Sequence, residues 1–102
     1  MKTITRTEEM ILLSILNLGE DAYLVAMKDY LEELTGKSVS MTSVHLPLSR
    51  LEKLGYIEAE MGEATAIRGG RRKKIYTVTK TGLEVLDEYK EMSDKLWSTY
   101  SR

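Results

Sequence analysis

A cluster of basic residues is the part of this sequence whose chemistry is most distinctive. The stretch IRGGRRKKIYTVTKTG occupies residues 67–82. Its first half contains two glycines and five basic residues, and its second half is rich in β-branched residues. Its cationic side chains are Arg68, Arg71, Arg72, Lys73 and Lys74. No acidic residue occurs between Glu63 and Glu84, so nothing within the segment neutralises them. Because guanidinium and ammonium groups bind phosphate oxygens, we expect a polyanionic partner.

The charge of the chain is divided unevenly along its length. The 102 residues carry a formal net charge of only −1. Residues 36–81 hold nine basic and four acidic residues, a net of +5. Residues 1–35 (three basic, seven acidic) and 82–102 (three basic, five acidic) are net negative. Electrostatic potential extends over about one Debye length, ~8–10 Å, so the local charge and not the total indicates the partner.

The composition argues against several functional classes. The chain has no cysteine, and His45 is its single histidine, so no nucleophile–base pair is evident and we do not expect an enzyme, a metal site or a cofactor. The apolar run 10–13 is followed by Ser14 and Asn17, too early for a signal peptide or a membrane span. We therefore expect a cytoplasmic, single-domain protein with no membrane contact.

Capping residues and glycines delimit two helices in the first third of the chain. Thr5 and Glu8 have the spacing of a capping box, and the apolar run 10–18 predicts a first helix that ends at Gly19. Apolar residues spaced by three and four positions predict a second helix over about 22–35.

A third helix is predicted to end near residue 54. Pro47 has no amide hydrogen and is tolerated best near a helix start, which places the predicted N-cap at Thr42 or Ser43. The predicted buried side consists of Val44, Leu48 and Leu51. Short polar residues then occupy the other side, where a ligand can reach them.

A β-hairpin is predicted after the third helix. Residues 56–61 alternate between apolar and acidic side chains, and residues 74–79 are rich in Ile, Tyr, Thr and Val. The connection 62–73 is longer than the usual two to five residues. Most of the basic cluster lies in this connection.

A last helix is predicted to begin near Thr79 or Thr81 and to carry a wide apolar stripe. The stripe consists of Val85, Leu86, Tyr89, Met92, Leu96 and Trp97. A small domain has too little surface to cover a face of this width, so we expect these residues to mediate homodimerisation.

The predicted order of elements is that of a winged helix-turn-helix, a mainly α fold with a small β-hairpin. We expect residues 1–80 to form the winged-helix DNA-binding domain and residues 81–102 a C-terminal dimerisation helix of the same compact unit. The major groove of DNA is ~12 Å wide and admits one helix. The predicted DNA-binding residues are Lys37, Ser40, Thr42, Ser43, His45, Ser49, Arg68, Arg71, Arg72, Lys73 and Lys74. For Arg50 a phosphate contact and an ion pair with Glu52 or a nearby helix cap are both open.

The sequence resembles the PadR-like transcriptional regulators. The matching segments are LGEDAY (18–23), ELTGKSVS (33–40), SRLEKLGYIEAEMGE (49–63) and RGGRRKKIYTVTKTG (68–82). The resemblance implies a winged-helix repressor that dimerises through its last helix and binds a palindromic operator in double-stranded DNA. It also implies a small aromatic effector stacked on Trp97, for which a packing role is the alternative. Most relatives have a tyrosine in place of His45, at a position that resembles a DNA-backbone contact.

Two classes of function are therefore open from the sequence. The first is a sequence-specific DNA-binding regulator, a repressor, that uses the third helix and the basic hairpin. The second is a dimeric winged-helix adaptor that binds an acidic protein and no operator. The steep salt dependence of DNA binding distinguishes the two.

Overall fold

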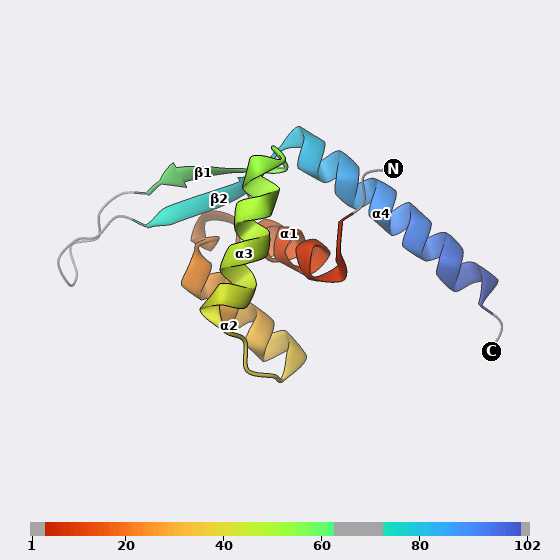
Figure 1. Ribbon diagram of the computed structural model, residues 1–102, viewed down its shortest axis with the longest axis horizontal. Helices are drawn as coiled ribbons and strands as arrows, with labels where there is room; N and C mark the ends of the chain where they lie inside the picture. Colours follow the sequence, from red (N-terminus) through yellow and green to blue (C-terminus); the bar gives the residue numbers. More distant parts are fainter. Residues whose placement is uncertain (1–3, 63–72, 101–102) are drawn as a thin grey trace.

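The computed structural model describes residues 4–62 and 73–100. The elements in chain order are α1 (Arg6–Leu18), the 3₁₀ turn η1 (Gly19–Asp21), α2 (Leu24–Thr35), α3 (Met41–Lys53), β1 (Ile57–Met61), β2 (Lys74–Val78) and α4 (Lys80–Thr99). The two strands form an antiparallel hairpin, so the predicted mainly α, winged-helix fold class is confirmed. Figure 1 shows α1, α2 and α3 as a central body from which the hairpin and α4 extend in opposite directions.

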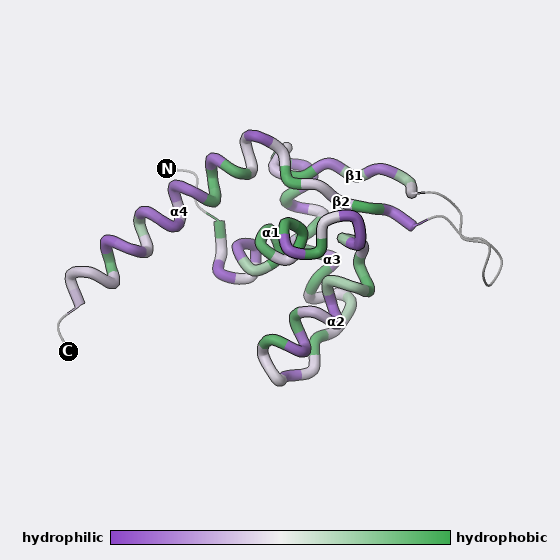
Figure 2. Tube along the Cα trace, turned by 180° about the vertical axis from the view of Figure 1, so that it is seen from behind, coloured by the Kyte–Doolittle hydropathy of each residue, from purple (hydrophilic) through white to green (hydrophobic). Residues whose placement is uncertain are grey.

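The core lies where the three helices of the body meet the hairpin. The predicted buried side of α3 is confirmed, whereas of the stripe predicted for α2 Met27 and Leu31 are buried and Leu34 is 64% exposed. The tube in Figure 2 shows apolar positions gathered around α1 and α3. The largest fully buried apolar side chains are Ile11, Leu12, Met27, Val44, Leu48, Leu51 and Ile57. Full burial of each such side chain contributes about 1.5–3 kcal/mol, so the core fixes α3 against α1 and α2.

The observed helix starts show which local sequence signals were sufficient to predict where a helix begins. In α1 the predicted capping box is present, because the Glu8 amide donates to Thr5 Oγ1 and the Thr5 amide donates to Glu8 Oε1. Helix α2 begins at Leu24, two residues later than predicted. The carbonyl of Ala22 accepts a hydrogen bond from the Tyr76 amide at 2.9 Å, which holds this residue out of the helix and against β2.

The predicted N-cap of α3 at Thr42 or Ser43 is wrong. Ser40 is the N-cap, and its Oγ accepts from the Ser43 amide at 3.1 Å. Pro47 consequently lies inside the helix, where it removes the amide that would donate to the Ser43 carbonyl. Ser43 is exposed, so water can hydrogen-bond this carbonyl and the helix continues through the proline.

Thr79, one of the two predicted starts of the last helix, is the N-cap of α4. Thr79 Oγ1 accepts from the Gly82 amide and donates to the Gly55 carbonyl at 2.6 Å. The start of α4 is thereby bonded to the turn that follows α3. The helix begins one position before the predicted domain boundary at 80/81, and its first turns belong to the body of the protein.

The predicted dimerisation stripe divides into two parts. Val85 and Leu86 are buried within this chain's own core, so in the single chain they are core residues and not an open face. Tyr89 packs partly against that core. Leu96 and Trp97 are 65% and 61% exposed on the half of α4 that projects from the body. The prediction of a dimer contact stays a prediction, and it now concerns mainly this projecting half.

Candidate nucleic-acid interface

One side of α3 is polar and open. Thr42, Ser43 and His45 are exposed and Ser49 is partly exposed, while the opposite side of the helix is buried in the core. The exposed side is therefore available to a groove of DNA without any change in the fold. Figure 1 shows α3 at the front of the body, directly beside the base of the hairpin.

The hydroxyl groups at the start of α3 differ in what they can still bind. Ser40 Oγ is used as the N-cap acceptor, and Ser43 Oγ donates to the Ser40 carbonyl at 2.7 Å. Among the described residues, the Thr42 hydroxyl makes no hydrogen bond and can both donate and accept. Thr42 is thus the residue of this turn best prepared to contact a base edge.

Two of the predicted cations lie at the start of β2, where the hairpin meets its connection, and they contact residues of the α2 start and of α3. Lys73 Nζ lies 4.0 Å from the centroid of the Tyr23 ring, a cation–π contact with the residue that precedes α2. Lys74 Nζ lies 3.5 Å from a carboxylate oxygen of Glu52 on α3. The predicted residues Arg68, Arg71 and Arg72 lie outside the described residues.

A hollow of about 460 Å³ joins these three elements. It is lined by Tyr23, Leu24, Val25, His45, Lys73, Lys74 and Tyr76. Tyr23 is the N-cap of α2 but supplies no side-chain hydrogen bond to the helix, so the first amides of α2 keep their partial positive charge at this site. With two ammonium groups and no carboxylate among its lining residues, the hollow favours an anion.

Tyr23 and Glu52 are site residues that the sequence prediction did not include. The predicted second helix, over about 22–35, placed Tyr23 in its first turn, and in the structure Tyr23 is the N-cap residue that precedes α2. No sequence signal indicated the contact with Lys73, because 50 positions of chain separate the two residues. The pairing of Glu52 with Lys74 is likewise a consequence of the fold.

Arg50 has a defined partner in the structure. Its guanidinium donates to Glu8 Oε2, and Glu8 is only 3% exposed at the start of α1. Of the two open options for Arg50, the structure contains the ion pair with a cap residue, although the cap belongs to α1. About half of the Arg50 side chain is still exposed.

The turn between α2 and α3 is held by a carboxylate. Glu32 accepts from the Val39 amide at 2.9 Å and from Lys28 Nζ at 3.0 Å. The backbone hydrogen bond from Val39, and next the Lys28 ammonium, lower the pKa of Glu32. The predicted contact residue Lys37 is exposed in this turn, on the approach to α3.

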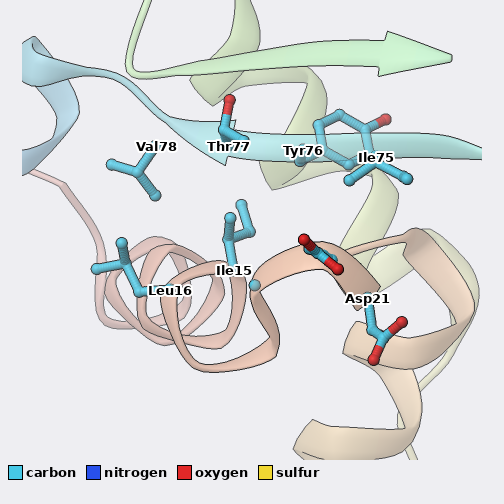
Figure 3. Close-up of a pocket in the computed structure, with 9 residues that line it drawn as sticks. Ile15, Leu16, Asp21, Ile75, Tyr76, Thr77 and Val78 are labelled. Atoms are coloured by element: carbon cyan, nitrogen blue, oxygen red, sulfur yellow. The ribbon is translucent and has the colours of Figure 1, made fainter. Parts of the chain in front are cut away.

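A second, larger concavity has a different character. The groove of about 850 Å³ lies between α1 and β2, and Figure 3 shows Ile15 and Leu16 of α1 opposite Val78 of β2. Glu20 and Asp21 also line it, so it does not favour a phosphate. Trp97, the predicted effector contact, lines neither this groove nor the basic hollow.

The described part of the chain offers little for metal or membrane chemistry. Within residues 4–62 and 73–100, no group of three or more His, Cys, Asp or Glu side chains is arranged to hold a metal ion. None of the helices in these ranges has the length and apolar character needed to cross a membrane.

Comparison with known proteins identifies a family and a fold. Residues 12–88 match the family model described as the transcriptional regulator PadR-like family. A PadR-like transcriptional regulator from Bacillus cereus has a similar crystal structure, with a TM-score of 0.74 and 29% identity over 90% of this chain and 84% of that chain. A transcriptional regulator from Clostridium thermocellum is similar in fold, with a TM-score of 0.70 and 22% identity over 98% and 100%. No curated protein sequence matches the chain.

Proposed function

This chain belongs to the PadR-like family of transcriptional regulators, and on that basis we propose that it is a repressor that binds a palindromic DNA operator as a homodimer. The observation that best supports the proposal is that Lys73 and Lys74 line one basic hollow together with His45, which lies on the exposed side of α3. Polar groups that can contact bases and cations that can contact phosphates thus share a surface. This combination is what a DNA interface requires.

In the proposed complex, α3 enters the major groove. Thr42 and Ser43 contact base edges near the N-terminus of the helix, where a recognition helix usually approaches the bases. Lys73 and Lys74, together with the arginines of the hairpin connection, contact the flanking phosphates. The phosphate contacts supply affinity for any sequence, and the base contacts supply the preference for the operator.

A homodimer fits both the operator and the exposed half of α4. Two copies of α3 related by a two-fold axis would contact successive major grooves ~34 Å apart, which is the spacing of a palindrome. Leu96 and Trp97 are large apolar side chains that a single chain leaves in water, and a second copy of α4 would cover them. Trp97 and Tyr100 form an edge-to-face pair with ring centroids 6.3 Å apart, and an aromatic effector held there is part of the same proposal.

A salt titration tests the proposal against the adaptor alternative. Fluorescence anisotropy with a duplex selected from random DNA, and with an unselected duplex, would be recorded over a series of salt concentrations. A DNA-binding protein gives a logarithm of affinity that falls linearly with the logarithm of salt, and it prefers the selected duplex by about 10³-fold or more. An adaptor that binds an acidic protein gives little binding to either duplex even at low salt, and that result would refute the proposal.

A further inference from the structure

The side of α3 that faces away from the core contains one large apolar side chain. This side is formed by residues spaced by four, three and four positions along the helix, which are Thr42, Leu46, Ser49 and Lys53. Leu46 is the apolar member of the set, and its side chain is 63% exposed. A leucine therefore lies in water among the polar residues of the helix that we propose to enter the major groove.

The direction of the Leu46 side chain follows from its neighbours along the helix. Val44 and Leu48, two positions before and after it, are both buried in the core with 1% exposure. Two positions turn an α-helix by about 200°, so Leu46 is directed to the opposite side, toward solvent. Exposed leucines are common on protein surfaces, and the informative feature here is the position among the polar residues of α3.

The base edges of the major groove have one apolar group that such a side chain can contact. Guanine, adenine and cytosine present hydrogen-bond donors and acceptors there, whereas thymine presents its C5-methyl group beside the O4 acceptor. A leucine that covers a donor or acceptor removes it from water and supplies no hydrogen bond in exchange, which is unfavourable. A leucine that covers the methyl group removes two apolar surfaces from water together, which is favourable.

We propose that Leu46 is a specificity-determining residue that packs on the C5-methyl group of a thymine in each half of the operator. The inference rests on the proposed function and names the base that this part of α3 selects. Thr42 lies four positions earlier, ~6 Å along the helix, whereas stacked bases are ~3.4 Å apart. Leu46 and Thr42 therefore contact different base pairs, and the thymine preference belongs to Leu46 alone.

Replacement of the thymine by deoxyuridine measures the contact directly. Deoxyuridine keeps the base pair and the O4 acceptor and lacks only the methyl group. Burial of one group of this size changes affinity about three- to fivefold, so wild type should lose this factor for each substituted half-site. Leu46→Ala is too short to cover the methyl group, so it should bind the thymine and deoxyuridine duplexes equally.

The variants are chosen so that the fold is kept. Leu46 is exposed and alanine favours a helix, so Leu46→Ala should be as stable as wild type. Leu46→Met keeps a long apolar side chain and should keep most of the sensitivity to the methyl group. Leu34→Ala is the matched control, because it makes the same change at a leucine of α2 that is 64% exposed, and it should keep the full sensitivity.

The salt dependence distinguishes a base contact from an effect on the phosphate contacts. An apolar side chain on a base releases no counterion from DNA. Leu46→Ala should therefore bind the selected duplex more weakly than wild type with an unchanged slope of log affinity against log salt. A reduced slope would show that Leu46 acts through the position of the cations, and it would overturn the inference.

The experiment uses the duplex that wild type selects from random DNA, remade with deoxyuridine at one thymine position at a time in both half-sites and measured by fluorescence anisotropy. Equal losses in wild type and Leu46→Ala would overturn the role of Leu46 and leave the proposed function intact. A selected half-site without a thymine, or with full tolerance of deoxyuridine, would do the same. A wild type that binds no duplex, or that prefers none, would refute the proposed function and the inference together.

Discussion

Arg50 of α3 forms an ion pair with Glu8 of α1, although 42 positions of sequence separate them. The Glu8 carboxylate is almost completely buried and also accepts from the Thr5 amide, so one side chain closes the cap of α1 and binds α3. A buried carboxylate is costly unless it is paired, and the guanidinium supplies the pairing charge. The helix that we propose to enter DNA is thereby held at a fixed position against α1.

Replacement of Arg50 by alanine should destabilise the protein. The Glu8 carboxylate would then lie buried without its cation, and we expect a loss of about 1–3 kcal/mol in the free energy of unfolding, since half of the Arg50 side chain is already in water. Urea denaturation followed by circular dichroism measures this loss. Glu9→Gln is the control, because its pair with Arg6 is long, at 3.7 Å, and the Arg6 side chain is 77% exposed, so this pair should contribute less than about 1 kcal/mol. Equal effects of the two variants would contradict the importance of the buried pair.

Thr42 should determine sequence preference more than overall affinity. Thr42→Val removes the hydroxyl and keeps the shape, so we expect a loss of about 1–3 kcal/mol in binding to the selected duplex and little change with an unselected duplex. Ser49→Ala is the comparison variant, because it also removes a hydroxyl, from a position two turns further along the same side of α3. Fluorescence anisotropy with both duplexes measures the ratio of the affinity for the selected duplex to the affinity for the unselected duplex. A variant that weakens both duplexes equally would place Thr42 at the backbone and not at a base.

The two lysines at the start of β2 should contribute unequally. Among the described residues the Lys73 ammonium has the Tyr23 ring as its partner and no carboxylate, whereas Lys74 must leave a carboxylate 3.5 Å away before it can pair with a phosphate. Lys73→Ala should therefore reduce affinity for all sequences and lower the salt slope by ~1, and Lys74→Ala should have the smaller effect. Lys90→Ala is the control, because Lys90 pairs with Asp94 on α4. A larger effect for Lys74 would show that its pair with Glu52 does not compete with DNA.

Local signals in the sequence predicted most of the fold. The capping box at Thr5, the cap at Thr79 and the apolar stripe of α3 each depend on residues within a few positions, and each is present. The predicted start of α2 failed because the Ala22 carbonyl is bonded to Tyr76, a partner from the other end of the domain. Tertiary contacts of this kind override local propensity and are not encoded in a short window.

The sequence indicated which residues the candidate interface contains, but not which of them contact one another. Exposed polar residues on α3 and the basic residues beside β2 followed from periodicity and charge. The N-cap of α3 was not predicted correctly. A proline in the exposed second turn destabilises the helix less than expected, because water can hydrogen-bond the Ser43 carbonyl. The contacts of Lys73 with Tyr23 and of Lys74 with Glu52 required the fold, since each joins two elements that are distant in sequence.

The projecting half of α4 should mediate self-association. Leu96 is 65% exposed in the single chain, so Leu96→Asp should leave the fold intact while placing a charge in the proposed apolar contact. We expect this variant to be monomeric in sedimentation or light scattering at concentrations where wild type is a dimer. Ser98→Asp, on an exposed position of the same helix, is the control for added charge. A monomeric wild type would contradict the dimer, and with it the binding of a palindrome by two joined copies.

Gly82 should be intolerant of even the smallest side chain. Glycine within a helix is usually unfavourable by about 0.5–1 kcal/mol relative to alanine, so Gly82→Ala would stabilise an ordinary helix. At Gly82 a Cβ atom would lie 2.1 Å from the Tyr56 carbonyl oxygen and 2.8 Å from Val78 Cγ1. Because the oxygen belongs to the backbone, α4 must move away from the hairpin, and we expect a net loss of about 1–3 kcal/mol.

Thermal unfolding of Gly82→Ala measures this loss against a neighbouring control. Thr81→Ala lies one position earlier in the same turn of α4 and is exposed, so it should change stability by less than about 0.5 kcal/mol. The movement of α4 also displaces the bond between Thr79 Oγ1 and the Gly55 carbonyl, which connects this helix to the turn after α3. Gly82→Ala should therefore weaken DNA binding as well as folding, through the position of α3 and the hairpin. An alanine variant as stable as wild type would show that α4 can move away from Tyr56 without cost.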